Sequence, residues 1–371
     1  MTISLRKAAG SLLVVGLGTT ELAALERAWL KLIRPAGIIL FKRNIVDPRQ
    51  TRSLLAESTA LCTAGSIRCV DLEGGTVDRL RDALAPMPSA QAVARAAQTK
   101  GKPVLAFEHG ELVARAVKAF GFNTSLAPVL DLALPASAAI LGTRTASESA
   151  SGVVEYARSF LSGLASQGVI GCGKHYPGLG GGSLDSHHDT PSINRSYQDL
   201  WHEDLLPYRE LHAELPMVMV AHAAYPDTPG RNVPASASSF WITTVLRKRI
   251  GYRGIIFSDD LEMGGILKCM SIEEATIAAI RAGTDLLEIC HSPELTLRAF
   301  ESLISEAERS TAFRKLLLLC AAKTARKRTH LFAAAASKPL ADSQFEALRT
   351  RIRRFSEKVK NSQPAPEAQS A

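Results

Sequence analysis

The chain has 371 residues, of which 46% are hydrophobic and 22% charged, an ordinary composition for a globular protein and one that argues against a disordered chain. It is long enough for one large α/β barrel or for two smaller domains. The net charge of +8 is uneven, because the stretch from Arg309 onward holds 14 Lys and Arg against 4 Asp and Glu, a local +10, so the rest carries −2. The body of the chain is therefore not basic, and we expect no nucleic-acid partner.

The first residues place two cations, Arg6 and Lys7, before an apolar run over residues 8–17. This resembles a short signal peptide, but no small-x-small cleavage site follows and the run is too short to span a membrane. We predict the first strand of a sheet instead, no membrane partner and a cytoplasmic location. The six cysteines form no CxxC pair and no cluster with His, which indicates reduced core residues in a reducing compartment.

Eight short apolar runs alternate with amphipathic helical stretches, a pattern typical of parallel strands joined by crossover helices. The runs cover residues 11–17, 37–41, 67–72, 125–129, 169–174, 217–221, 254–258 and 285–289. Helices are predicted between them, for example over residues 150–166, 197–213, 239–249 and 272–282, the last with the capping box of Ser271 and Glu274 at its start. Eight strands predict an α/β fold built as a single (β/α)8 TIM-type barrel.

Beyond the eighth run, the pattern predicts additional C-terminal helices over residues 292–307, 311–327 and 342–360. In the last of these, apolar residues from Phe345 to Phe355 are spaced to share one face. Residues 362–371 are predicted to be disordered. We therefore divide the chain into a barrel domain over residues 1–335 and a basic helical tail over residues 336–371.

Polar residues recur directly after five of the predicted strands. Each could be a cap or a loop residue on its own, but the carboxyl ends of barrel strands meet at one face, so together they predict a polar pocket there. The residues are Asp71 and Glu73, Asp131, Lys174 and His175, His222, and Asp259 and Asp260.

Residues 254–263 read GIIFSDDLEM, a buried strand that ends abruptly in Asp259 and Asp260. Two carboxylates at such a position are costly unless they are paired or used. Asp260 is also suited to cap the following helix. The segment predicts a functional acid at the carboxyl end of the seventh strand.

A second polar group lies in residues 174–191, which read KHYPGLGGGSLDSHHDTP. Lys174 and His175 end a buried strand, and a glycine-rich stretch then leads to Asp185 and His187. An Asp two residues before a His can orient the imidazole and raise its pKa, which makes a proton-transfer group. On a mobile loop such a pair could close over a substrate; the alternative is a polar surface loop with chance histidines.

Seven segments in a fixed order resemble family 3 glycoside hydrolases, and within them the bacterial β-N-acetylglucosaminidases of peptidoglycan recycling. The resemblance covers about residues 11–291. The segments are LFKRNI (40–45), VDLEGGTVDR (70–79), LAPVLD (126–131), KHYP (174–177), DSH (185–187), MVAH (219–222) and FSDDLEM (257–263).

The resemblance implies a retaining exo-β-N-acetylglucosaminidase that removes terminal GlcNAc from peptidoglycan fragments, the GlcNAc-anhydro-muropeptides. It implies that Asp259 is the nucleophile that forms a covalent glycosyl-enzyme, and that His187 with Asp185 is the acid/base dyad. The implied sugar-binding residues are Asp71, Arg79, Arg144, Lys174 and His175. The implied mechanism needs no metal and no organic cofactor, and we expect a monomer.

The chain departs from the family pattern in the glycine-rich loop, where Gly180, Gly181 and Gly182 stand in place of a segment that usually contains His and Asp. Two alternatives therefore stay open. One is a β-N-acetylglucosaminide phosphorylase, because a His acid/base leaves the site less anionic and phosphate could replace water. The other is a catalytically weak sugar-binding protein.

Overall fold

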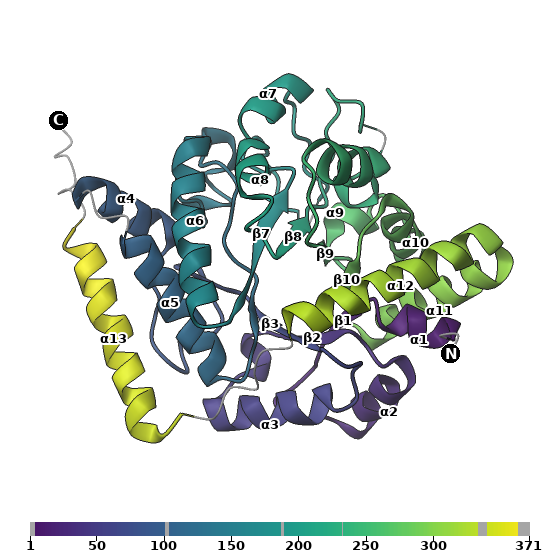
Figure 1. The fold of residues 1–371 in the computed structure, drawn as a ribbon, viewed down its shortest axis with the longest axis horizontal. Helices are drawn as coiled ribbons and strands as arrows, with labels where there is room; N and C mark the ends of the chain where they lie inside the picture. The colour runs from purple at the N-terminus through teal and green to yellow at the C-terminus, as the bar shows by residue number, and fades with distance from the viewer. Residues whose placement is uncertain (1–3, 101–103, 187–188, 232, 333–339, 363–371) are drawn as a thin grey trace.

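The computed structural model of the protein describes residues 4–100, 104–186, 189–231, 233–332 and 340–362. Within these ranges, eight parallel strands close into a barrel in the order β1-β10-β9-β8-β7-β6-β3-β2 (Figure 1). The predicted TIM-type barrel is confirmed. Its strands are β1 (Leu13–Gly16), β2 (Gly37–Leu40), β3 (Ile67–Val70), β6 (Thr124–Ser125), β7 (Ile170–Tyr176), β8 (Met217–Val220), β9 (Ile255–Asp260) and β10 (Leu286–Ile289). A small antiparallel pair, β4 (Leu72–Gly74) with β5 (Val77–Asp78), follows β3.

Helices surround the barrel (Figure 1). The α-helices are α1 (Leu5–Gly10), α2 (Ala24–Ile33), α3 (Pro48–Thr59), α4 (Ala90–Lys100), α5 (Val104–Ala119), α6 (Ala150–Ser166), α7 (Tyr197–His202), α8 (Leu206–Leu211), α9 (Gly264–Leu267), α10 (Ile272–Ala282), α11 (Pro293–Arg309), α12 (Thr311–Leu331) and α13 (Asp342–Lys360). Short 3-10 turns are η1 (Lys42–Asn44), η2 (Pro135–Ser137), η3 (Gly142–Arg144) and η4 (Ala235–Ala237), and η5 (Phe240–Arg249) is π-helical.

Local sequence signals explain where several helices begin and end. The predicted capping box of α10 is confirmed: the Ser271 N–H donates to Glu274 Oε2 at 2.9 Å, and the Glu274 N–H donates to Ser271 Oγ at 3.3 Å. Asp47 caps α3 in a similar way, accepting from the Gln50 N–H at 2.8 Å. At the other end of α10, Gly283 adopts a φ of 109°, the left-handed conformation that favours glycine.

The core has two layers, as expected for side chains that alternate between the two faces of barrel strands. Inward-facing side chains fill the barrel, including Val14, Cys69, Cys172, Met217, Ile255, Phe257 and Leu286. Outward-facing side chains such as Val15 and Leu287 pack instead against the helices. The barrel is therefore a filled scaffold, and it holds the strand ends rigidly in place.

Several element bounds differ from the predictions, each for a local reason. The helix predicted over residues 197–213 is two helices, α7 and α8, because Pro207 has no N–H to donate and Asp204 turns inward to pair with Arg195 at 3.1 Å. The strand predicted over residues 125–129 shortens to β6, and Val129 keeps only an isolated bridge to Lys174. The first run is confirmed as β1, preceded by α1.

At the C-terminus, α13 packs against α4 and α5 on the outside of the barrel (Figure 1). It buries Leu348, Ile352, Phe355 and Val359 on one face, as the apolar spacing predicts. Arg351 pairs with Glu111 of α5 at 2.6 Å. The predicted disorder of residues 362–371 falls almost wholly outside the described residues.

Two further predictions concern membranes and cysteines. Among the described residues, no helix has the length and apolar character needed to cross a membrane. The cysteines are free, and Cys62, Cys69, Cys172 and Cys290 are buried, whereas Cys269 is exposed.

Candidate active site

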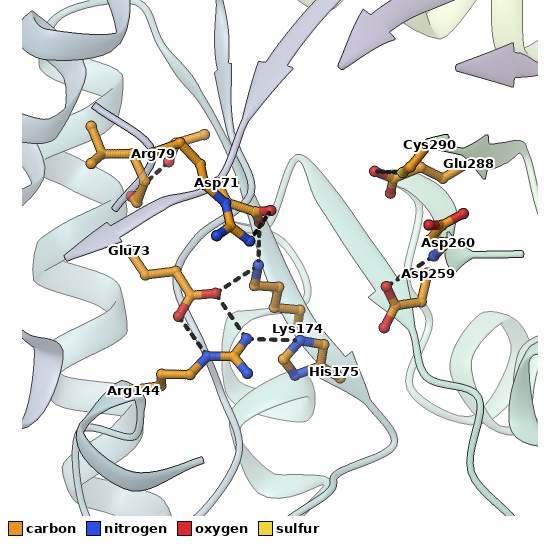
Figure 2. Close-up of polar contacts among 12 residues, drawn as sticks. Asp71, Glu73, Arg79, Arg144, Lys174, His175, Asp259, Asp260, Glu288 and Cys290 are labelled. Carbon is orange, nitrogen blue, oxygen red and sulfur yellow. Dashed lines mark hydrogen bonds and ion pairs between the residues drawn. The ribbon is translucent and has the colours of Figure 1, made fainter. Parts of the chain in front are cut away.

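One wall of a cavity at the carboxyl ends of the strands is a buried ion-pair network. Lys174, on β7, places Nζ 2.8 Å from Asp71 Oδ1 and 2.7 Å from Glu73 Oε1 (Figure 2). Arg144, in η3, grips the same Glu73 carboxylate with Nε and a terminal nitrogen, each at 2.9 Å. Arg79 approaches the free side of Asp71, at 3.6 Å. Each cation of this wall is thus held in a defined position by at least one carboxylate.

His175 belongs to the same wall and is oriented from behind by Asp131. Its Nδ1 lies 2.7 Å from Asp131 Oδ2, and its Nε2 lies 3.3 Å from a terminal nitrogen of Arg144. Because a guanidinium can only donate, Nε2 must accept, so Nδ1 carries the proton and donates to Asp131. Asp131 also accepts from the Leu179 N–H at 2.7 Å, and this contact ties the glycine-rich loop to the wall.

The network keeps its members charged despite burial. Burial alone raises the pKa of Glu73, but Arg144 and Lys174 outweigh it and hold that pKa well below its usual range. Burial alone lowers the pKa of Lys174, but Asp71 and Glu73 reverse this and raise it. Burial likewise raises the pKa of Asp71, and Lys174 and Arg79 bring it below its ordinary value. The wall therefore presents fixed donors and acceptors suited to hydroxyl groups.

The opposite wall carries Asp259, at the end of β9 (Figure 2). Its Oδ1 accepts from the Asp260 N–H at 2.9 Å, and the side chain lines the same cavity as Asp71 and Lys174. Within the described part of the chain, no cation forms an ion pair with Asp259. Because β9 runs through Asp260, longer than predicted, Asp259 stands on the strand itself and its position is set by the barrel.

Behind Asp259 the loop after β9 is fastened to the end of β10. Glu262 accepts from the backbone N–H groups of Cys290 at 2.8 Å and Ser292 at 2.7 Å, and also from that of His291. Burial raises the pKa of Asp260 to about 7, and the charges of Glu262 and Asp259 add to this. Asp260, Glu262 and His291 bring ligand-type atoms within 4.8 Å of one another, but Glu262 already accepts hydrogen bonds from three backbone N–H groups. These groups are therefore best explained as the support that holds Asp259 in place.

The loop that follows the glycine-rich stretch reaches this same wall. Asp185 and Ser186 line the cavity with Asp259. The Gly265 N–H at the start of α9 donates to the Ser186 carbonyl at 2.9 Å, and Thr190 Oγ1 donates to the Gly265 carbonyl at 2.9 Å. A Cβ at Gly265 would lie 2.8 Å from the Ser186 oxygen, so this close approach requires glycine. The predicted acid/base His187 lies outside the described residues.

The structure brings most of the predicted site residues together. The cavity is lined by Asp71, Arg79, Arg144, Lys174, His175, Asp185 and Asp259. Asp131 and His222, predicted as pocket residues, are buried and do not line the cavity. Asp131 lies behind His175, and His222 contacts Ser236 and the Asp260 carbonyl. Glu73 was predicted as a pocket residue but not as a sugar-binding residue. Glu288 was not predicted, although its isolated charge in an apolar strand could have pointed to it.

A second, larger cavity, of about 780 Å³, lies between α3, the end of α5 and the start of α13. Arg52 and Arg68 line it together with apolar side chains of α3 and α13. None of the polar residues predicted at the carboxyl ends of the strands lines this cavity, so it does not fit the glycosidase chemistry expected of those residues. We place the active site in the smaller cavity, where the acids and cations converge.

Comparison with known proteins identifies the family of the chain. Residues 4–314 match the glycosyl hydrolase family 3 N-terminal domain. The chain belongs to glycosyl hydrolase family 3. A β-hexosaminidase of Xanthomonas campestris is 36% identical over 296 residues, which cover 79% of this chain and 88% of that protein. The family 3 member described here is accordingly a glycoside hydrolase of the β-N-acetylhexosaminidase type.

Solved structures of family 3 proteins share the fold. A β-N-acetylglucosaminidase from Paenibacillus sp. superposes with a TM-score of 0.86 at 27% identity, over 96% of this chain and 69% of that one. NagZ from Neisseria gonorrhoeae superposes with a TM-score of 0.75 at 28% identity, over 96% and 98% of the two chains. This family 3 chain therefore matches NagZ over nearly the full length of both proteins.

Proposed function

We propose that the chain is a retaining exo-β-N-acetylglucosaminidase that hydrolyses terminal, non-reducing β-linked GlcNAc from peptidoglycan fragments. The observation that carries the proposal is the placement of Asp259 at the rigid end of β9, facing the Asp71–Lys174 wall across one cavity. A carboxylate so placed suits attack on an anomeric carbon held by that wall. We further propose a cytoplasmic monomer that acts on GlcNAc-anhydro-muropeptides.

The proposed reaction has two displacements. In the first, an Asp259 oxygen bonds to the anomeric carbon as the bond to the leaving oxygen breaks, and the His187 imidazolium protonates that oxygen. In the second, His187 takes a proton from water, the water oxygen attacks the anomeric carbon, and Asp259 leaves. Two inversions retain the β configuration. Support for the dyad comes from Asp185, which lines the same cavity as Asp259.

The opposite wall would bind the sugar away from its reacting carbon. We propose that Asp71 accepts from sugar hydroxyls, and that Lys174, Arg144 and Arg79 donate to hydroxyl and acetamido oxygens. His175, held in position by Asp131, would orient a hydroxyl group of the sugar. Because these side chains are fixed by ion pairs before substrate arrives, they would position the anomeric carbon at little entropic cost.

A phosphorylase is disfavoured by the charges around Asp259. Glu262 lies behind the proposed nucleophile, and Asp260 lies beside it. An incoming phosphate dianion would meet these acids, and the cations of the opposite wall already have carboxylate partners. Water, being neutral, is the acceptor that this environment favours.

The proposal is tested with an aryl β-N-acetylglucosaminide, with and without phosphate. We expect GlcNAc as the product in both cases, released first as the β anomer in a proton NMR time course. Asp259→Asn should lower kcat by at least about 10³-fold, because the covalent step is lost. Sugar-1-phosphate as the main product would establish the phosphorylase. Binding of the aryl substrate without turnover, unchanged in the Asp259 variant, would establish the sugar-binding alternative.

A further inference from the structure

Glu288 is a buried acid in the wall of the active-site cavity that the proposed mechanism does not use. It lies on β10 and pairs in register with Asp260 of β9. Only 2% of its surface is exposed, yet it lines the cavity together with Asp259 and Cys290. Figure 2 places its carboxyl on the Asp259 side, across from Asp71 and Lys174. A barrel strand otherwise made of Leu and Ile thus turns one carboxyl inward beside the proposed nucleophile.

The hydrogen bonds of Glu288 differ from those of Glu73 on the opposite wall. Glu73 is gripped by two cations, whereas no cation pairs with Glu288 in the described ranges. Its Oε1 accepts from the Cys290 thiol at 3.3 Å. Its Oε2 is buried and has no hydrogen-bond partner among the described residues. One oxygen of the carboxyl is therefore occupied, and the other has no partner within the protein's described part.

The surroundings of Glu288 determine its protonation. Burial raises the pKa of this carboxyl well above its usual range, and the charges of Asp260, Asp259 and Asp71 add to the effect. Burial also raises the pKa of the Cys290 thiol, which lies directly after β10, so this thiol is protonated. A neutral carboxylic acid has one O–H to donate. Because Oε1 accepts from Cys290, that proton belongs on Oε2, the atom without a partner.

A sugar in the cavity would supply the missing acceptor. In the proposed reaction, Asp259 bonds to the anomeric carbon. Because Glu288 lies on the strand next to that of Asp259, we expect Glu288 to face the substituents that flank this carbon. On GlcNAc these are the acetamido group at C2 and the hydroxymethyl group at C5. The hydroxyls at C3 and C4 lie farther from the anomeric carbon, toward the Asp71–Lys174 wall.

We propose that Glu288 is a substrate-binding residue, whose carboxyl turns toward the cavity and donates a hydrogen bond to the acetamido or hydroxymethyl oxygen of the bound sugar, and so contributes to sugar specificity. This inference rests on the proposed function, because it assumes an N-acetylglucosaminide in the cavity. A buried donor without an acceptor is costly, and a substrate that provides the acceptor is therefore preferred over one that does not.

The test compares Glu288→Leu, which removes the donor, with Glu288→Gln, the matched control that keeps a neutral donor of the same shape. On an aryl β-N-acetylglucosaminide, kcat/KM should fall roughly tenfold or more for Glu288→Leu and stay within about threefold for Glu288→Gln. The same enzymes are assayed on the 6-deoxy substrate and on the aryl β-glucoside, which lacks the acetamido group. On one of these two substrates, the kcat/KM of Glu288→Leu should equal that of the parent.

Three outcomes decide the matter. An equal loss for Glu288→Leu on all three substrates, or no loss on the first, overturns the inference. If Glu288→Leu unfolds, the affinity for GlcNAc is measured by calorimetry in three proteins that all carry Asp259→Asn: one without a further change, one with Glu288→Gln and one with Glu288→Met. Only the protein with Glu288→Met should bind GlcNAc about tenfold more weakly. Equal affinities in all three overturn the inference. A parent enzyme that does not cleave the aryl N-acetylglucosaminide would refute the proposed function instead, which keeps the two failures distinct.

Discussion

Glu73 accepts from two cations at once, with Lys174 Nζ at 2.7 Å and Arg144 through two nitrogens at 2.9 Å. Removing an acid from such a buried set leaves positive charge without compensation, which costs far more than the loss of a surface pair. The residue-scale consequence is that the sugar-binding wall and the stability of the fold depend on the same carboxylate. Glu301, which pairs with Arg6 at 3.0 Å on the surface, offers a matched comparison.

Glu73→Gln should lower the free energy of unfolding by about 3–5 kcal/mol at pH 7, measured by urea denaturation. Glu301→Gln should cost at most about 1 kcal/mol. Since the folded-state pKa of Glu73 is depressed, its stabilising contribution is present above the ordinary glutamate pKa and is lost as the pH falls through the depressed value. The difference between parent and Glu73→Gln should therefore shrink below about pH 4; a difference that grows there would refute this account.

Glu288 carries the opposite pH dependence, because its folded-state pKa is raised by burial and by Asp260. Between the ordinary and the raised pKa the folded state holds a proton that the unfolded state has lost, so stability falls as the pH rises. Glu288→Gln removes this loss of stability at higher pH. Relative to the parent, its unfolding free energy should improve by up to about 1.4 kcal/mol per pH unit as the pH rises above the ordinary glutamate pKa. Thermal and urea unfolding across this range check it, and a pH-independent difference would mean that Glu288 is ionised.

At the scale of elements, the site joins a rigid strand to a docked loop. β9 fixes Asp259, while the segment around Ser186 is held by the backbone of Gly265 at 2.9 Å. Gly265 also lies against the His222 carbonyl, which an added Cβ would approach to 2.8 Å. The segment around Ser186 therefore docks against α9 because the second residue of this helix has no side chain.

Gly265→Ala should displace the loop and lower kcat/KM by roughly 10- to 100-fold, with a smaller effect on KM, because the proton donor moves away from the leaving oxygen. Gly18→Ala is the control, since a Cβ there would meet its nearest atom, Glu26 Oε1, at 3.5 Å. Steady-state kinetics and thermal unfolding of both variants are compared. Normal turnover in Gly265→Ala would show that the docked position of the loop is not the working one.

Much of this element-scale arrangement could be predicted from the sequence. Strand identity and the acids at strand ends follow from apolar runs that stop at polar residues, as in FSDD. The break between α7 and α8 was missed because Pro207 sits inside an otherwise helical pattern, and a proline is also tolerated in a first helical turn. The π-helical form of η5 was not predicted either; this element buries Trp241 and Ile242.

On the scale of the whole molecule, α13 lies outside the barrel and far along the chain from the catalytic strands. It packs on α4 and α5 through Ile352 and Phe355, both buried, and Phe355 stacks on His109 at 6.0 Å. The sequence predicted this helix and its apolar face, but not its docking site, because residue spacing carries no information about which helices of the barrel receive it. The basic charge of the tail is partly used in docking, as Arg351 and Lys358 pair with Glu111 and Glu108.

Ile352→Ala should lower the free energy of unfolding by about 2–5 kcal/mol through the cavity that it leaves, with kcat/KM unchanged. Arg353→Ala, on the exposed face of the same helix, should change stability by less than about 0.5 kcal/mol. Denaturation and kinetics of the two variants are measured side by side. A large loss of kcat/KM in folded Ile352→Ala would show that α13 supports the active site.

The most direct test of the central claim is to trap the covalent intermediate. The enzyme is incubated with a 5-fluoro derivative of an activated 2-acetamido-2-deoxy sugar, digested, and the labelled peptide mapped by mass spectrometry. We predict one sugar per chain, attached to Asp259. A label on another residue, or turnover of the aryl substrate with the α anomer released first and no label at all, would contradict the account.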